Sequence, residues 1–166
     1  MNIRRMTLDD LAQVIAIDKA SFSLPWPERS FRFEITDNPA SRAWVAELDG
    51  KIVGVIVAWL LVDEAHIATI AAHPDFRRQG IAGRLLIHAL EFMKNEGALT
   101  SVLEVRESNR AAQEMYRKFG FEESGRRPRY YRDNSEDAIL MTLHRLEGLK
   151  VEGSKSKVKG RKSKVE

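Results

Sequence analysis

Apolar positions at the start of the chain follow a helical period. Behind Thr7, a residue type that often caps helix N-termini, apolar residues recur at helical spacing up to Ile17. Pro27 suits the first turn of a second helix, which we expect to reach about Asp37. A short strand around residues 3–6 precedes both. The pattern therefore predicts one strand followed by two helices.

The next part of the chain is extended. Two β-rich runs, residues 43–48 and 51–62, flank the dipeptide Asp49-Gly50, and this arrangement predicts a hairpin. A third run covers residues 66–73. Because these strands follow one another without helices between them, the pattern argues against a Rossmann fold.

Helices and strands alternate in the second half. Residues 80–96 have a helical period, residues 99–106 read as a strand and residues 108–119 as a second helix. Closing strands are expected around residues 121–124 and 138–144. The order is strand, two helices, three strands, helix, strand, helix and two strands, which predicts one mixed α/β (α+β) domain.

Composition divides the chain into two parts. Its 166 residues suffice for one domain with a buried core, and the lack of cysteine excludes disulfides, thiolate nucleophiles and cysteine-ligated metals. The net charge is +3, but residues 147–166 hold seven Lys or Arg against three Glu, so the remaining residues carry −1. We expect a domain over residues 1–146 and a basic, disordered tail over residues 147–166.

The location expected from the sequence is the cytoplasm, because the first ten residues lack the apolar core of a signal peptide. The longest apolar stretch, Ile52 to Val62, has eleven residues and is too short to span a bilayer. No membrane association is expected.

A glycine-containing loop, R-R-Q-G-I-A-G at residues 77–83, precedes a predicted helix. Glycine costs about 1 kcal/mol relative to alanine inside a helix, so the two glycines need a reason. A helix N-terminus offers free main-chain N–H groups and partial positive charge, which suit a phosphate, and Arg77 and Arg78 add charge. A turn whose glycines only solve a packing problem is the alternative. The loop matches neither the Walker A nor the dinucleotide-binding glycine pattern.

The motif R-x-x-G-x-A at residues 77–82, with this order of elements, resembles the GNAT acetyltransferase superfamily. Within it, the chain is similar to the bacterial ribosomal-protein alanine N-acetyltransferases over about residues 2–144. The stretches that carry this likeness are residues 25–31, 63–71, 103–109, 111–121, 126–131 and 136–141.

The resemblance implies a GNAT fold with about seven mostly antiparallel strands, about four helices and splayed central strands that form an acetyl-CoA cleft. It implies acetyl transfer from acetyl-CoA to the N-terminal amine, with alanine as the terminal residue, of a small-subunit ribosomal protein. It also implies three groups of coenzyme-binding residues. These are the loop amides of Arg77, Arg78, Gln79, Gly80, Ile81, Ala82 and Gly83; the strand amides of Ile70, Ala71 and Ala72; and Asn109.

Glu104 is the candidate general base. In the strand V-L-E-V-R, Glu104 shares one face with Val102 and Arg106, so a carboxylate stands in an apolar strand. An ion pair with Arg106 or a partly exposed strand edge would also explain it. The resemblance assigns the glutamate as a base that acts through water. An α-amine needs only about 1 kcal/mol to lose its proton at pH 7, whereas lysine needs about 4.6 kcal/mol, so a carboxylate suits an N-terminus better.

Tyr116 is the candidate general acid. A phenol with a pKa of about 10 keeps its proton at neutral pH and can donate it to a departing thiolate. Tyr116 follows Asn109 by two helical turns, and the resemblance gives the tyrosine this role. Ordinary packing beside Met115 and Phe119 is the alternative.

The remaining candidates concern the substrate and other ligands. Acidic groups could attract the terminal ammonium and aromatic rings could wall the first side chain; the candidates are Trp26, Glu64, Tyr130 and Tyr131. The alternatives are a hydrophobic plug for Trp26, a turn residue for Glu64 and sheet surface for Tyr130 and Tyr131. The four histidines, His66, His73, His88 and His144, show no ligand spacing, so they are expected to be isolated and no metal is predicted. The basic tail could weakly contact ribosomal RNA or be a solvated terminus.

Three other functions stay open at this point. They are a broader N-terminal or small-amine acetyltransferase, a non-catalytic acyl-CoA sensor, and a ribosome-associated binding module that uses the tail. Because a sensor needs neither Glu104 nor Tyr116, the presence of both favours an enzyme.

Overall fold

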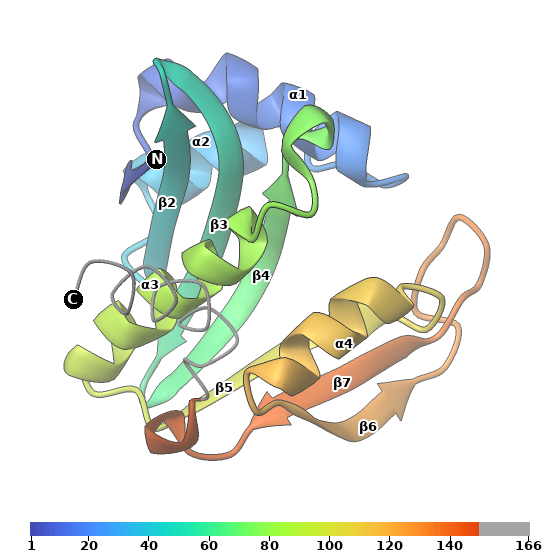
Figure 1. Ribbon diagram of the computed structural model, residues 1–166. Coiled ribbons are helices and arrows are strands. Elements are labelled where there is room, and N and C mark those ends of the chain that lie inside the picture. Colours follow the sequence, from blue (N-terminus) through green and yellow to red (C-terminus); the bar gives the residue numbers. More distant parts are fainter. Residues whose placement is uncertain (150–166) are drawn as a thin grey trace, which may run out of the picture.

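A computed structural model describes residues 1–149, in which one seven-stranded sheet is covered by helices on both faces (Figure 1). The sheet order is β1-β2-β3-β4-β5-β7-β6, and every neighbouring pair is antiparallel except β4 with β5. The strands are β1 (Asn2–Arg5), β2 (Ser41–Leu48), β3 (Lys51–Leu61), β4 (Glu64–Ala72), β5 (Thr100–Arg106), β6 (Glu122–Arg127) and β7 (Ala138–Leu143). The helices are α1 (Leu11–Ser21), α2 (Glu28–Thr36), α3 (Ile81–Asn95) and α4 (Arg110–Lys118). The predicted fold class and element order are confirmed.

The first helix begins later than the periodicity predicts. Leu8–Asp10 form a 3-10 turn, and α1 starts only at Leu11. The Asp10 carboxylate accepts the main-chain N–H of Thr7 at 2.8 Å and pairs with Arg4 at 2.8 Å, which holds this turn against β1. Leu8 is consequently exposed and does not join the core.

Two hydrophobic cores lie on opposite faces of the sheet. The larger core packs α3 and α4 on one face and includes Trp44, Ile56, Leu86, Leu103 and Phe121. The smaller core packs α1 and α2 on the other face and includes Val14, Ile17, Phe31, Val55 and Val57. Alternation along each strand therefore decides which pair of helices a side chain meets.

The central strands β4 and β5 separate after a short paired stretch. Their parallel pairing joins Glu64–Ile67 to Thr100–Leu103 and goes no further. Beyond it β4 continues against β3 and β5 continues against β7, so the two strands diverge in Figure 1. The expected splay of the central strands is confirmed, and it opens the sheet in its middle.

A bulge in β4 lies at this divergence. Val57 of β3 pairs with Thr69 and the next residue, Ala58, pairs with Ile67, so Ala68 is an extra residue. Before it, Ile67 faces the larger core; after it, Ile70 does. The bulge thus shifts the alternation of the strand by one position.

Residues at the end of the described chain pack on the domain. The turn Leu146–Gly148 includes the buried side chain of Leu146, and Leu149 contacts the larger core. Residues 150–166, most of the expected tail, lie outside the described residues. Within residues 1–149, none of the helices is long and apolar enough to cross a membrane.

Candidate active site

Glu104 lies beside the point where β4 and β5 separate, on the face covered by α1 and α2. Its neighbours Leu103 and Val105 enter the larger core on the opposite face, as the alternation predicts. The Glu104 carboxylate accepts a hydrogen bond from His66 Nε2 at 2.9 Å. This bond lowers the pKa of Glu104 and outweighs burial, which acts in the other direction. The carboxylate is therefore ionised at neutral pH and half-buried.

His66 corrects two expectations. It is not an isolated histidine, because it binds Glu104. The Glu104 carboxylate does not pair with Arg106, whose guanidinium is directed to Asp133 and Glu136 instead. Residues two apart on one strand face are separated by a full pleat, whereas His66 stands on the adjacent strand.

A row of polar contacts extends from His66 toward α2. The Trp59 ring packs edge-on to the His66 ring with centroids 5.3 Å apart. Trp59 Nε1 donates to Glu34 Oε1 at 2.5 Å, and the other oxygen of Glu34 accepts from Asn38 at 2.8 Å. Glu34 is buried, so these donors satisfy a carboxylate that would otherwise be costly. The row fixes the orientation of the histidine that contacts Glu104.

A cavity of about 450 Å³ adjoins this row. Its lining comes from the start of α2, the preceding loop and β3: Trp26, Arg29, Ser30, Phe33, Glu34 and Trp59. Trp26 is held by the Asp18 carboxylate, which accepts its main-chain N–H at 2.7 Å, and by its ring contact with Phe31. Of the predicted substrate residues, Trp26 thus lines a cavity that reaches Trp59, whose ring packs against the histidine bonded to Glu104.

Tyr116 lies on the other face of the sheet, in the core beneath α3 and α4. Burial raises its pKa well above that of a free phenol, so the hydroxyl keeps its proton. Among residues 1–149, Ser41 Oγ is the one fully shielded side-chain atom without a hydrogen-bond partner. Tyr116 is buried, and its ring packs against Phe121 with centroids 5.8 Å apart.

Tyr131 lies against Arg106, on the face of β5 that also carries Glu104. It lies in the loop between β6 and β7, with the guanidinium of Arg106 4.0 Å from its ring centre. Burial raises the pKa of Tyr131 to about 12, and Glu104 adds to this while Arg106 opposes it. Tyr131 in turn raises the pKa of Tyr116. At neutral pH both phenols keep their protons, so the charges beside the opening in the sheet are those of Glu104 and Arg106.

Two other predicted substrate residues, Tyr130 and Glu64, lie at the edge of this opening or away from it. Tyr130 is exposed and packs edge-on against Tyr131, with ring centroids 5.1 Å apart. Glu64 stands at the start of β4, where β4 is still paired with β5 through Thr100. The paired stretch of β4 and β5 ends at Leu103, so Glu64 lies at the opposite end of this stretch from Glu104.

The glycine loop fits an anion through its main chain. Gly80 caps α3 with φ of 76° and Arg78 has φ of 64°, so the chain turns tightly here. Within residues 1–149 the N–H groups of residues 77–80 donate no hydrogen bond, and those of residues 81–83 begin a helix. The side chain of Arg77 donates from its guanidinium to Ala20 O and Ser21 Oγ at the C-terminal end of α1. These amides could hold a diphosphate.

The two glycines of this loop are needed for different structural reasons. Gly80 allows the left-handed backbone at the start of α3. A Cβ at Gly83 would lie 3.0 Å from Phe119 Cζ, so its lack of a side chain lets α3 approach the end of α4. Packing, the alternative explanation for the glycines, therefore applies to Gly83.

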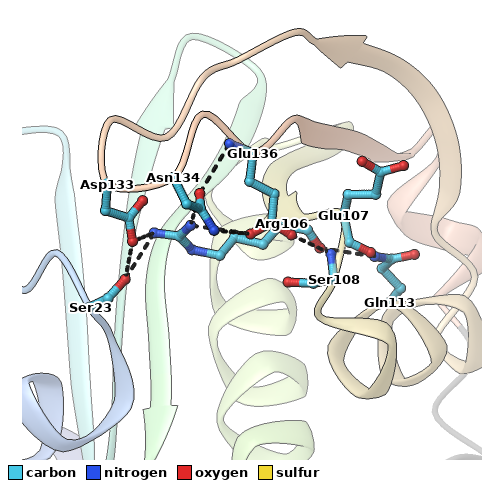
Figure 2. Close-up of polar contacts among 8 residues, drawn as sticks. All are labelled: Ser23, Arg106, Glu107, Ser108, Gln113, Asp133, Asn134 and Glu136. Atoms are coloured by element: carbon cyan, nitrogen blue, oxygen red, sulfur yellow. Dashed lines mark hydrogen bonds and ion pairs between the residues drawn. The ribbon is translucent and has the colours of Figure 1, made fainter.

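Other predicted coenzyme residues border the same opening. Ile70, Ala71 and Ala72 end β4 beyond the paired stretch, where β5 no longer uses that edge. Asn109 caps α4 by accepting the N–H of Ala112 at 3.2 Å. Gln113 donates to the carbonyl oxygens of Arg106 and Glu107, both at 2.9 Å, which fixes the start of α4 (Figure 2).

Sequence reasoning missed His66, Trp59, Glu34 and Arg106. The one available signal was a histidine and a tryptophan on predicted neighbouring strands, but their contact depends on the bulged register. Within residues 1–149, no group of three or more His, Cys, Asp or Glu side chains could hold a metal ion.

The fold, in which a bulged β4 diverges from β5 beside the start of α3, matches that of solved N-acetyltransferases. The profile of the Acetyltransferase (GNAT) family matches residues 11–121, and the chain belongs to this family. It is an acetyl-CoA-dependent N-acetyltransferase.

Its relatives are more specific. The [ribosomal protein bS18]-alanine N-acetyltransferase of Escherichia coli is 34% identical over 145 residues, which is 85% of this chain and 95% of the relative. A Bacillus subtilis protein provisionally assigned the same activity is 40% identical over 139 residues, 84% of this chain and 92% of that protein. The crystal structure of the Escherichia coli ribosomal-protein-S18-alanine N-acetyltransferase has a TM-score of 0.79 and 33% identity, and covers 86% of this chain and 92% of its own. An N-alpha-acetyltransferase of Sulfurisphaera tokodaii is 35% identical over 152 residues, 84% of this chain and 90% of its own.

Proposed function

We propose that the protein acetylates the N-terminal α-amine of a ribosomal protein, with alanine as the terminal residue. The observation that carries this proposal is the Glu104–His66 pair at the opening between β4 and β5. The names of the bacterial relatives support the ribosomal substrate and the alanine. Such a substrate would place the reaction in the cytoplasm.

Glu104 acts as the general base in this proposal. The incoming ammonium must lose a proton before its nitrogen can attack the thioester carbonyl carbon, and Glu104 accepts that proton through one water. His66 keeps the carboxylate ionised and oriented. General-base catalysis of this kind is worth about 10²–10⁴ in rate.

Tyr116 acts as the general acid. When the carbon–sulfur bond breaks, the sulfur leaves as a thiolate and takes the Tyr116 proton. The attacking nitrogen, now bonded to the carbonyl carbon, loses its second proton to water, and the Tyr116 phenolate is reprotonated from water. The raised pKa of Tyr116 supports this role because the phenol is protonated at every working pH. Base and acid approach from opposite faces of the sheet, through the gap between β4 and β5.

Acetyl-CoA is held by main-chain groups in this proposal. The amides of residues 77–83 bind its diphosphate, those of Ile70, Ala71 and Ala72 its pantetheine and carbonyl, and Asn109 a further coenzyme group. Trp26, Tyr130 and Tyr131 border the peptide. Nothing in the described residues or the comparisons supports RNA contact by the tail.

The test is a panel of peptides with free N-termini, beside lysine peptides with blocked termini, assayed with acetyl-CoA by mass. We expect a mass gain of one acetyl group on alanine-terminal ribosomal peptides. The Glu104→Gln variant should lose about 10²–10⁴ of kcat and still show the thermal shift that acetyl-CoA gives the wild type. Acetylation of the blocked lysine peptides alone would overturn the proposal.

A second candidate is a broader N-terminal acetyltransferase. The similarity to the Sulfurisphaera tokodaii N-alpha-acetyltransferase favours it, because the identity is 35%, against 34% for the Escherichia coli relative. The same panel separates the two, because a broader enzyme would accept serine and methionine termini at rates comparable to alanine.

A further inference from the structure

Arg106 joins two loops that border the candidate site (Figure 2). Its guanidinium donates to Ser23 Oγ and to Asp133 Oδ2, both at 3.1 Å, and Ser23 Oγ donates to the same Asp133 oxygen at 2.5 Å. Ser23 belongs to the α1–α2 loop (residues 22–27) and Asp133 to the β6–β7 loop (residues 128–137). The contact thus connects segments 110 positions apart in the chain.

The other side of the guanidinium holds the rest of the β6–β7 loop. Its Nη1 lies 3.3 Å from Asn134 Oδ1 and 3.3 Å from Glu136 Oε1, and its centre lies 4.0 Å from the middle of the Tyr131 ring. The second oxygen of Glu136 accepts the N–H of Ser108 at 2.6 Å. Hydrogen bonds from Ser108 lower the pKa of Glu136 to about 2, so Arg106 keeps a charged partner at any working pH.

This set of contacts needs an arginine at this position. One planar guanidinium with five N–H donors reaches both loops and still stacks on an aromatic ring, whereas a lysine ammonium cannot do all three. Arg106 stands two residues after Glu104 on the same face of β5, so the loops it joins lie next to the candidate base.

We propose that Arg106 is a positioning residue for the peptide substrate. By fastening the α1–α2 loop to the β6–β7 loop and fixing Tyr131, it shapes one rigid entrance through which the terminal amine reaches Glu104. This inference rests on the proposed function, in which a peptide passes between these loops.

A role in general stability alone makes a different prediction. A variant that only unfolds more easily has fewer active molecules, so its kcat falls while both KM values stay the same. A variant that loses the entrance binds peptide less well, so the KM for peptide rises while kcat at saturation and the KM for acetyl-CoA change little.

Arg126 provides a matched control. It also makes two ion pairs, with Glu107 at 2.8 Å and with Asp137 at 3.0 Å, but none with the α1–α2 loop. Arg126→Met therefore removes as many ion pairs as Arg106→Met from the same half of the domain, without separating the two loops.

The kinetic experiment compares these variants on an alanine-terminal peptide. We expect Arg106→Met to raise the peptide KM about tenfold or more, the equivalent of one hydrogen bond to a charged group. Arg106→Lys should recover part of this and Arg126→Met should match the wild type. If Arg106→Met misfolds, Ser23→Ala removes only the hydroxyl that bonds Arg106 and Asp133 and should raise the peptide KM in the same sense. An unchanged peptide KM in both Arg106→Met and Ser23→Ala would overturn the proposal.

A second measurement does not depend on activity. Since the chain has no cysteine, spin labels can be placed at Leu24→Cys and Arg132→Cys, one in each loop. We expect a narrow distance distribution that broadens with Arg106→Met and not with Arg126→Met. If the wild type acetylates no peptide, the proposed function fails, and this measurement still decides whether Arg106 joins the loops. Equal widths in all three proteins would show that it does not.

Discussion

The Glu104 carboxylate is hydrogen-bonded to His66 of the adjacent strand β4, at the point where the pairing of β4 with β5 ends with Ile67 and Leu103. The pair unites a strand from the first half of the domain with one from the second. Because Glu104 is half-buried, the histidine decides which protonation state the carboxylate prefers.

Replacing His66 by alanine should change the pH profile of the reaction. In the wild type the pKa of Glu104 is lowered, so between pH 5 and 7 the carboxylate stays ionised, and the amine gives log kcat/KM a slope of about 1. Without His66 the main cause of this lowering is lost, while burial still raises the pKa of Glu104 and Arg127 still lowers it. The pKa of Glu104 should therefore rise, and the slope should steepen toward about 2 at the acid end. Peptide assays from pH 5 to 9 measure this. A profile parallel to the wild type would mean that His66 does not govern Glu104.

The same pair should contribute to stability in a defined pH window. A carboxyl group with a lowered pKa in the folded state stabilises the fold above its unfolded pKa, and this contribution disappears as the pH falls through the folded value. The difference in free energy of unfolding between wild type and His66→Ala should therefore shrink in acid. Urea denaturation at pH 7 and pH 3 tests this, with Glu104→Gln, which lacks the titration, as control.

Tyr116→Phe should separate chemistry from packing. The ring stays in the core, so Tm should hold. If the hydroxyl protonates the leaving sulfur, kcat should fall about 10²-fold or more. Circular dichroism melting and saturation kinetics check both. Full kcat in this variant would return Tyr116 to a packing role.

Gly54→Ala should disturb the glycine loop by displacing the start of α3. A Cβ at Gly54 would lie 2.6 Å from Ile81 Cγ2 and 2.9 Å from Leu85 Cδ1, so the first turn of α3 must shift. We expect a loss of about 1–3 kcal/mol in stability and a higher KM for acetyl-CoA. Gly148→Ala, whose Cβ would meet nothing within 4 Å, is the control. An unaltered acetyl-CoA KM despite the stability loss would mean that the loop does not follow the helix.

Trp26→Ala should weaken peptide binding. Trp26 walls the cavity beside Trp59, and loss of a large aromatic contact typically costs about 2 kcal/mol of binding. The peptide KM should rise about 30-fold while that of acetyl-CoA stays. Phe92→Ala removes an exposed aromatic ring that packs on Trp44 under α3, remote from the cavity, and should leave both values unchanged.

Periodicity alone predicts the order of elements and the face that Glu104 occupies, because both depend on neighbours in the sequence. The partners of Glu104 and Arg106 could not be predicted in this way. His66 is 38 positions from Glu104, and their contact requires the register of two strands that meet only after folding. Gly83 illustrates the same limit, since Phe119, the ring it accommodates, comes from another helix.

The additional residue at Ala68 has a consequence for how β4 can vary. It lets one strand present His66 to the face of α1 and α2 and, a few positions later, Ile70 to the face of α3. Deleting that single residue would move the side chains after it to the opposite face of the sheet, so that Ile70 would meet α1 and α2. The length of β4, and not only the identity of its residues, therefore determines what each face of its far end presents.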